Sequence, residues 1–358
     1  MSPLRLSPSF KAHKTLQWIV LIVAGGLAGF ILHKAGLPAA LLLGPMLVAI
    51  AMGTLGARIQ VPRILFRSGQ GVVGLLVAKS VTLSVLLALA KDWYLMALVT
   101  LLTIGLSFGV GLILACASKI PPDAAAWGTG PGAASAMIAM AEEQGADSRI
   151  VASMQYIRVV CVVMLGAWVS HMLVAPGAMH EFTQMEVGAN WLGLLATLAL
   201  AFMGALSGNL IPAGALITPI ILGTALQLSG YMEITLNDTI MTLAYGAIGG
   251  YIGLRFTRAT IIQVARLVPV ILTANIVLIV LCGLLAWPLS GVFQKDFLSM
   301  FLATSPGGLD SMAIIAVETG SDASFVVALQ TLRLLGVVLC GAVCSNLVIK
   351  LSTKFSGH

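Results

Sequence analysis

The stretch Thr129-Gly-Pro-Gly-Ala-Ala-Ser-Ala-Met137 interrupts an otherwise apolar chain, and a related stretch, Thr304-Ser-Pro-Gly-Gly-Leu-Asp-Ser-Met312, follows 175 positions later. Proline followed by glycine inside an apolar segment breaks a helix or begins a new one. A helix that begins inside a membrane leaves free N–H groups and the positive end of its dipole exposed there. The sequence therefore predicts two broken helices, one in each half of the chain.

The repetition extends well beyond these two stretches. Five residue types recur downstream of each at the same offset, namely Glu143, Gly145, Asp147, Gln155 and Arg158 in the first half and Glu318, Gly320, Asp322, Gln330 and Arg333 in the second. Upstream, Pro38 and Pro45 in the first half correspond to Pro212 and Pro219 in the second. An offset of 174 or 175 residues over most of the chain indicates an internal duplication.

The composition indicates an integral membrane protein. Of 358 residues, 59% are hydrophobic and 9% are charged, and the mean hydropathy is +1.04, whereas a soluble domain carries about a quarter charged residues. The net charge of +6 is what lysine and arginine at the membrane surface supply, so it gives no reason to expect nucleic acid as a partner. The five cysteines lie in apolar segments without a CxxC motif and are expected to be buried, inert thiols.

The apolar runs predict an all-α fold with five membrane-spanning helices in each half. The expected spans are near residues 16–35, 38–54, 69–90, 93–117 and 149–174, and near 191–208, 212–229, 239–256, 268–289 and 323–349. The Pro-Gly segments are left over, and each gives a helix of roughly 21 Å, too short for about 30 Å of hydrocarbon. Each segment is therefore expected to be a re-entrant or broken helix.

The chain accordingly divides into five parts along its length. We expect a cytoplasmic N-terminal arm at 1–15, repeat one at 16–175, a linker at 176–190, repeat two at 191–350 and a cytoplasmic tail at 351–358. The basic N-terminal arm is expected to remain uncleaved ahead of the first span.

The charges of the loops favour two repeats inserted in opposite orientations. With the basic N-terminus in the cytoplasm, the loop that holds Arg58, Arg63 and Arg67 is also cytoplasmic, whereas its counterpart at 231–238 has no lysine or arginine. The linker at 176–190 also lacks both. Inverted repeats in a bacterial inner membrane, with both termini cytoplasmic, fit these charges better than the alternative of parallel repeats.

Each Gln-x-x-Arg motif is the strongest candidate for chemistry. Arg158 and Arg333 fall near the middle of their expected spans, where a charge is costly and usually faces a cavity or a partner. Gln155 and Gln330 lie one turn earlier on the same helix face. One interpretation is a site for a small anion such as a carboxylate, closed by the helix starts at the prolines. The equal alternative is that each arginine caps carbonyls of a broken helix or pairs with an acid.

Asp310 is a second candidate, because its counterpart in the first half is Ser135 and duplication alone does not explain the acid. In the first turn of a helix it is favoured by the dipole. It could bind Na⁺ or carry a proton with help from Ser311, or it could be the partner of an arginine. The acids that end the broken helices, Glu143, Asp147, Glu318 and Asp322, are expected to be solvated caps and turns.

Several function classes lack the residues that they need. The five histidines are scattered, with no two at ligand spacing, so no metal and no cofactor is expected. No GxSxG, Walker A or HExxH motif is present, so the chain is not expected to be an enzyme.

At its motifs the chain resembles the membrane AbrB family, the AbrB-duplication proteins. The resemblance covers almost the full length and rests on Pro38-Ala-Ala-Leu-Leu-Leu-Gly-Pro45, on Ala126-Trp-Gly-Thr-Gly-Pro-Gly132 with Met154-Gln-Tyr-Ile-Arg158, and on Ala303-Thr-Ser-Pro-Gly-Gly-Leu-Asp310 with Gln330-Thr-Leu-Arg333. Members of this family carry the labels ammonia monooxygenase or regulator of aidB expression, and they share the AbrB name with an unrelated small DNA-binding transition-state regulator. The family is similar to the superfamily of cation:proton antiporters and anion transporters, which implies inverted repeats with broken helices.

These observations together predict a secondary-active transporter of a small anionic solute. The predicted solute contacts are Thr129, Pro131, Gly132, Gln155 and Arg158 in repeat one and Thr304, Ser305, Pro306, Gly307, Gln330 and Arg333 in repeat two, with Asp310 and Ser311 for a coupling Na⁺ or H⁺. The expected partners are the solute and the lipid bilayer, and a homodimer stays open. The alternatives are a membrane-embedded regulator of gene expression without transport and, as the weakest, an ammonia monooxygenase-like enzyme.

Overall fold

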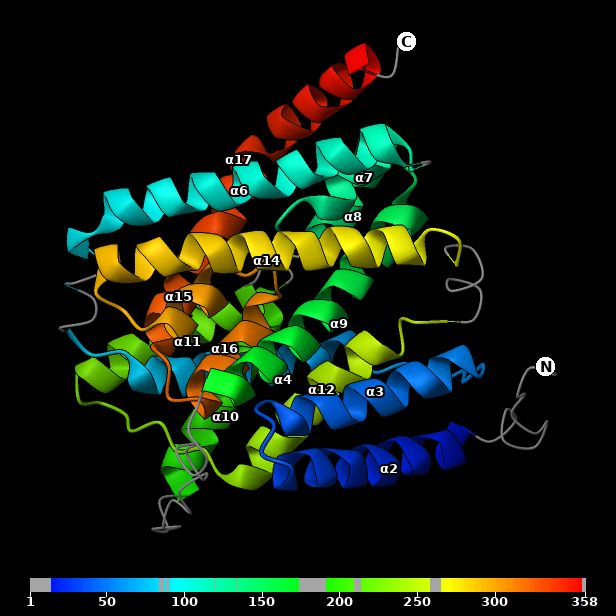
Figure 1. Cartoon of the computed structure of the whole chain (residues 1–358). Coiled ribbons are helices and arrows are strands. Elements are labelled where there is room, and N and C mark those ends of the chain that lie inside the picture. The colour runs from blue at the N-terminus through cyan, green and yellow to red at the C-terminus, as the bar shows by residue number, and fades with distance from the viewer. Residues whose placement is uncertain are drawn as a thin grey trace. The chain divides into compact units, whose positions relative to one another are not determined.

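The computed structural model describes residues 14–83, 87, 90–118, 120–132, 134–173, 191–208, 214–257 and 265–355, and Figure 1 traces the chain. The regular secondary structure in these ranges is helical throughout, as the sequence predicts. The helices are α2 (Lys14–Lys34), α3 (Ala40–Thr54), α4 (Arg63–Ser80), α6 (Trp93–Ala117), α7 (Pro122–Thr129), α8 (Ala134–Glu143), α9 (Ser148–Leu173), α10 (Trp191–Ser207), α11 (Gly214–Leu228), α12 (Asp238–Gly253), α14 (Val268–Phe293), α15 (Phe297–Thr304), α16 (Leu309–Glu318) and α17 (Ala323–Phe355).

Several of these helices have the length and composition of membrane spans. Within the described residues α2, α6, α9 and α14 are each long and apolar enough to cross a bilayer, and α17 is a fifth if its two segments, bent by 43°, count as one span. Shorter apolar helices, such as α3 and α11, accompany them. The predicted all-helical class is therefore confirmed for the described residues, and the length and composition of these helices are consistent with a membrane protein.

Most predicted spans coincide with a helix, and α4 departs furthest from its predicted range. The helix covers 63–80 instead of 69–90, so Arg63 and Arg67 lie in its first turns and not in a loop. The reason is local, because Pro62 is extended and its carbonyl accepts the N–H groups of Leu65 and Phe66, which starts the helix there. At the other end of the chain α17 continues to Phe355, so the first residues of the predicted tail are helical.

The chain forms two compact units, and neither coincides with one half of the sequence. Unit 1 comprises Met1–Leu86, Ala167–Ile261 and Ala313–Gly320, and unit 2 comprises Leu87–Gly166, Ile262–Met312 and Ser321–His358. Each unit thus combines helices from both halves. The two broken helices and both Gln-x-x-Arg motifs belong to unit 2, apart from the last part of α16, which belongs to unit 1. The linker at 176–190 and most of the N-terminal arm lie outside the described residues.

Unit 1 is held together by close backbone contacts at glycines. α2 runs alongside α3 (Figure 1), and a Cβ built on Gly44 would lie 2.1 Å from the backbone nitrogen of Gly29. A Cβ on Gly249 of α12 would lie 2.3 Å from the carbonyl oxygen of Leu42 in α3. Small residues allow this approach, which is how helices gain packing energy inside a membrane.

Unit 2 packs around Trp127, which is 1% exposed and belongs to the short helix α7. α7 contacts both α6 and α17, while α15 contacts α14 and α17. Gly111 of α6 makes room for the Thr129 side chain, and Gly128 of α7 makes room for Met154 of α9. These contacts fix the C-terminal ends of α7 and α15, where the chain breaks.

Candidate functional site

Both breaks have the same local structure. α7 ends at Thr129 and α15 at Thr304, and the next residue of each, Gly130 and Ser305, is extended, with ψ of 127° and 140°. A residue before proline is sterically excluded from the helical region, so the proline that follows stops each helix at the observed position. The two breaks that the Pro-Gly stretches predict are therefore present.

Each break leaves carbonyl groups without a helical partner, and the glutamines take some of them. Gln155 Nε2 donates to the carbonyl oxygens of Trp127 at 2.9 Å and Gly130 at 3.2 Å. Gln330 Nε2 donates in the same way to Leu302 O at 2.7 Å. Buried carbonyls need such donors because water is not available to them.

The arginines complete the capping of both breaks. Arg158 donates through Nη1 to the carbonyls of Gly130 (2.8 Å) and Thr129 (3.3 Å) and through Nη2 to that of Gly132 (3.3 Å). Its Nη2 also donates to Gln155 Oε1 at 2.6 Å. The contacts therefore match the carbonyl-capping alternative for this residue.

Arg333 repeats this arrangement at the second break. Its Nη1 donates to Ser305 O at 2.6 Å, and its Nη2 donates to Gly307 O at 3.1 Å and Gln330 Oε1 at 3.3 Å. Each Gln-x-x-Arg motif is thus one capping device, in which the glutamine carbonyl orients the guanidinium and both side chains satisfy the broken helix.

The capped breaks still carry unbalanced positive charge. Arg158 and Arg333 are 2% and 5% exposed, and they are close enough for their charges to repel each other. Within the described residues no carboxylate forms an ion pair with either arginine. Among the described residues, the Nε–H group of each arginine and the buried hydroxyl of Ser305 have no hydrogen-bond partner.

The second break lies against the helix that carries Arg158. A Cβ on Gly307 would come within 2.9 Å of Val162 Cγ1, and Val162 lies one turn beyond Arg158 on α9. The structure therefore brings together the predicted contacts of both repeats inside unit 2: Thr129, Pro131, Gly132, Gln155 and Arg158 with Thr304, Ser305, Pro306, Gly307, Gln330 and Arg333.

The remaining predicted side chains make local contacts. The hydroxyls of Thr129 and Thr304 each donate to a carbonyl one turn earlier, at 2.9 Å, and Ser311 Oγ donates to Gly308 O at 2.9 Å. Asp310 is half-buried in the first turn of α16, as its position predicts. The three hydroxyl contacts help to hold the breaks in position.

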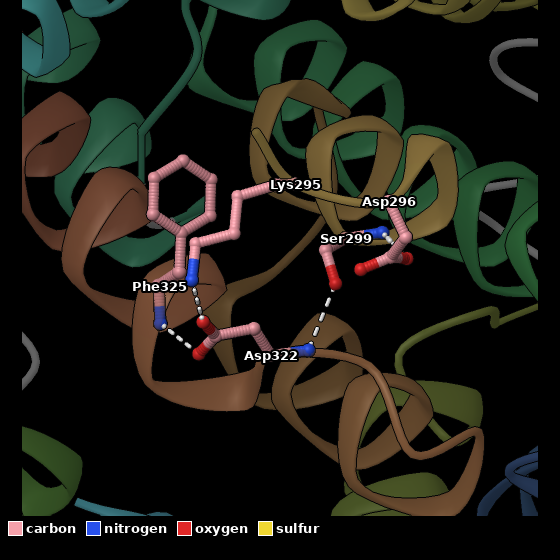
Figure 2. Close-up of polar contacts among 5 residues, drawn as sticks. All are labelled: Lys295, Asp296, Ser299, Asp322 and Phe325. Carbon is pink, nitrogen blue, oxygen red and sulfur yellow. Dashed lines mark hydrogen bonds and ion pairs between the residues drawn. The ribbon is translucent and has the colours of Figure 1, made fainter. Parts of the chain in front are cut away.

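After the second broken helix, Asp322 contacts residues of α15 and α17 and Lys295, which follows α14 (Figure 2). Its Oδ1 accepts the N–H of Phe325 at 3.0 Å, so the predicted helix cap is present, and its Oδ2 pairs with Lys295 Nζ at 2.6 Å. Its N–H donates to Ser299 Oγ at 2.8 Å, and Asp296 accepts the N–H of Ser299 at 2.7 Å. The ion pair with Lys295 has no signal in the sequence.

Replacing Asp322 by alanine should destabilise the protein, because it removes the cap of α17 and the partner of Lys295 together. We expect a loss of about 1–2 kcal/mol, nearly all of it from the cap, since a partly exposed ion pair contributes about 0–1 kcal/mol. Thermal unfolding in detergent measures the loss. Asp322→Asn, which retains a capping oxygen, should recover most of it, and equal stability of Asp322→Ala and the native protein would contradict the capping role.

Glu318 corrects one expectation from the sequence. It was expected to be a solvated cap at the membrane surface, but it is only 8% exposed. Its Oε2 accepts a hydrogen bond from the N–H of Ala39, which lies 279 positions away. The packing of α16 on a residue that precedes α3 buries the carboxylate, and no local pattern predicts such a contact.

Comparison with known proteins finds a family model and relatives that match most of this chain. A family model described as "Transition state regulatory protein AbrB" matches residues 41–349. The chain is 36% identical over 347 residues to the Escherichia coli K12 protein named "Putative regulator AbrB", covering 95% of this chain and 99% of that protein. It is 27% identical over 347 residues to the Bacillus subtilis 168 protein named "Uncharacterized protein YhjN", covering 90% of each. No solved structure matches the chain.

Proposed function

The chain belongs to the AbrB family, and from the geometry of its two broken helices we propose that it is a secondary-active transporter of a small anionic solute. The observation that carries the proposal is the pair of buried guanidinium groups, Arg158 and Arg333, that repel each other and have no carboxylate partner among the described residues. Two uncompensated buried charges are costly. A bound anion would lower that cost.

Hydrogen-bond donors at the breaks support the same ligand class. The Nε–H groups of both arginines and the hydroxyl of Ser305 have no partner in the described part of the chain, and an unmade buried hydrogen bond costs about 1–3 kcal/mol. An anion with oxygen acceptors can take several of these donors at once. The solute is therefore proposed to lie where the carbonyl ends of α7 and α15 are capped, with Gln155 and Gln330 orienting the arginines.

The transport cycle in this proposal uses the repetition of the sequence. Two inverted repeats of five spans each, in a bacterial inner membrane with cytoplasmic termini, would let the breaks face either side in turn. Asp310 and Ser311, in the first turn of α16, are the candidates for a coupling Na⁺ or H⁺ at the break itself.

A ligand screen with a matched pair of variants tests the proposal. Purified protein is heated in detergent with formate, acetate, lactate, succinate, glutamate, phosphate or sulfate, because a ligand that binds only the folded state raises the unfolding temperature. At least one small anion should do so, and the radiolabelled form of that anion should enter proteoliposomes that contain the protein.

Ser305→Ala should then weaken the binding of that anion. It removes one neutral donor, worth about 1 kcal/mol or roughly fivefold in Kd. Ser153→Ala is the control, because the Ser153 hydroxyl is buried on α9 and donates to the Arg149 carbonyl of its own helix. The proposed site is wrong if no anion stabilises the native protein. It is also wrong if Ser305→Ala and Ser153→Ala bind the anion with equal affinity.

The name of the Escherichia coli relative, "Putative regulator AbrB", favours a second candidate, a membrane-embedded regulator without a transport cycle. Such a protein would bind the anion at the breaks and signal its presence to a partner. Proteoliposomes separate the two candidates, since a transporter exchanges internal for external labelled anion whereas a regulator binds it without exchange.

A further inference from the structure

A buried acidic site lies in unit 1, whereas the residues proposed to bind the solute belong to unit 2. Glu318 is the last residue of α16, and Tyr245 lies near the middle of α12. Glu318 is 8% exposed and Tyr245 is fully buried. Both Glu318 Oε1 and the Tyr245 hydroxyl lack a hydrogen-bond partner within the described residues, yet the two groups are close enough to interact electrostatically.

The other carboxylate oxygen is held by a backbone group in an unusual conformation. Glu318 Oε2 accepts the N–H of Ala39, and Ala39 has left-handed dihedral angles, φ 55° and ψ 25°, just before α3. A non-glycine residue in this region costs about 1–2 kcal/mol, and such strain gathers at functional sites when the surroundings impose it. Ala39 is fully buried and its carbonyl accepts the N–H groups of Leu42 and Leu43, so the start of α3 is fixed around the carboxylate.

No positive side chain on α3, α12 or α16 balances this carboxylate. α3 has no ionisable residue, and α12 has Tyr245 together with Asp238 and Tyr251 near its two ends. On α16 the other ionisable residue is Asp310, two turns before Glu318. Within the described residues Glu318 forms no ion pair. The N–H of Ala39 and the positive end of α3 are what favour the ionised form, while burial favours the neutral form.

We propose that Glu318 is a proton-binding site, in which Oε1 takes a proton from water and releases it again. Protonation forms one O–H bond on Oε1 and breaks one O–H bond of the hydronium ion that donates the proton. The carboxylate becomes a neutral carboxylic acid. The new O–H group and the Tyr245 hydroxyl then form a neutral polar pair, and the hydrogen bond from Ala39, no longer charge-assisted, becomes weaker. The proton thus changes how tightly the end of α16 is attached to the start of α3.

The proposal deepens the transport proposal in one respect, because in a transporter this proton would be a coupling ion bound at Glu318, in place of the ion proposed at Asp310 and Ser311. α16 begins next to the second break and ends at Glu318. Protonation at one end of this ten-residue helix would therefore act on the segment that follows Ser305 and Gly307. The proton-binding step itself does not require that a solute be transported.

Infrared spectroscopy of the purified full-length protein during a pH titration tests proton binding without any solute. The native protein should show a carboxyl C=O band that appears as the pH falls, and Glu318→Gln should lack it. The control is Glu142→Gln, which replaces a carboxyl group exposed on α8 and should leave the band of Glu318 unchanged. Tyr245→Phe should keep the band and shift its midpoint, because it removes the neighbouring hydroxyl.

Two results would overturn the inference: a native spectrum without a titrating band assigned to Glu318, or identical titrations of the native protein and Glu318→Gln. A transport assay adds the coupling step. If a labelled anion exchanges across proteoliposomes, Glu318→Gln should retain exchange at equal pH and lose accumulation driven by a pH gradient. Absence of exchange in the native protein would count against the transport proposal alone, whereas unchanged gradient-driven accumulation in Glu318→Gln would count against the coupling role of Glu318.

Discussion

Arg333→Ala is expected to lose about 3 kcal/mol or more of unfolding free energy, because two buried carbonyls then lack their charged donor. The native guanidinium donates to Ser305 O and Gly307 O and to the Gln330 side chain. In a water-free interior none of these acceptors can find a replacement. The variant should therefore unfold at a much lower temperature in detergent, or fail to accumulate in the membrane.

Two further variants distinguish the effect of losing the carbonyl capping by Arg333 from the effect of losing its positive charge. Arg333→Lys retains the charge but lacks the planar fork that spans both carbonyls, so it should be intermediate in stability. Arg149→Ala, at the exposed start of α9, is the control and should change stability by less than about 0.5 kcal/mol. Native-like unfolding of Arg333→Ala would show that the carbonyls do not depend on the arginine, and the capping model would fail.

Gly44→Leu should also disrupt the fold, through steric overlap. Even a single Cβ at this position would lie 2.1 Å from the nitrogen and 2.4 Å from the Cα of Gly29. Since these are backbone atoms, α2 and α3 would have to separate along their contact, at a cost above about 3 kcal/mol. We expect loss of folded protein, measured by the amount of monodisperse protein recovered after extraction and by its unfolding temperature.

Gly105→Leu is the matched control for this substitution. Gly105 lies inside α6, and a Cβ built there meets no atom within 4 Å. Leucine also has the higher helix propensity, by up to about 1 kcal/mol. The control should therefore fold as well as the native protein, and equal recovery of the two variants would mean that the close α2–α3 contact is not needed.

The breaks and their arginines were predictable from sequence because they depend on local chemistry. Proline excludes the residue before it from the helix, so Pro131 and Pro306 determine where α7 and α15 stop. A three-residue spacing places Gln155 beside Arg158 on one helix face, and the structure joins them by a hydrogen bond. What the spacing leaves open is the direction in which the guanidinium donates, because a free anion and a helix carbonyl offer it equivalent acceptors.

Contacts between distant residues were not predictable in this way. Glu318 ends its helix as a surface cap would, and only the fold brings it to Ala39. The pairing of Lys295 with Asp322 likewise depends on how α14 and α17 pack. The division into two units has the same origin, since each unit is assembled from helices far apart in the chain. The start of α4 was missed for a local reason, because Pro62 acts as the residue before the helix and not as a loop residue.

The two arginines are not equivalent as receptors for a ligand. Arg158 uses its Nη atoms for four acceptors, namely three carbonyls and the Gln155 side chain, whereas Arg333 uses its own for three. Arg158 therefore has no free Nη–H group with which to bind a carboxylate through two hydrogen bonds at once. An anion that binds at the breaks would accept a hydrogen bond from Arg158 only through its Nε–H group, and it would depend mainly on Arg333. If the proposed transport occurs, this unequal sharing of the anion between the two arginines would favour its release.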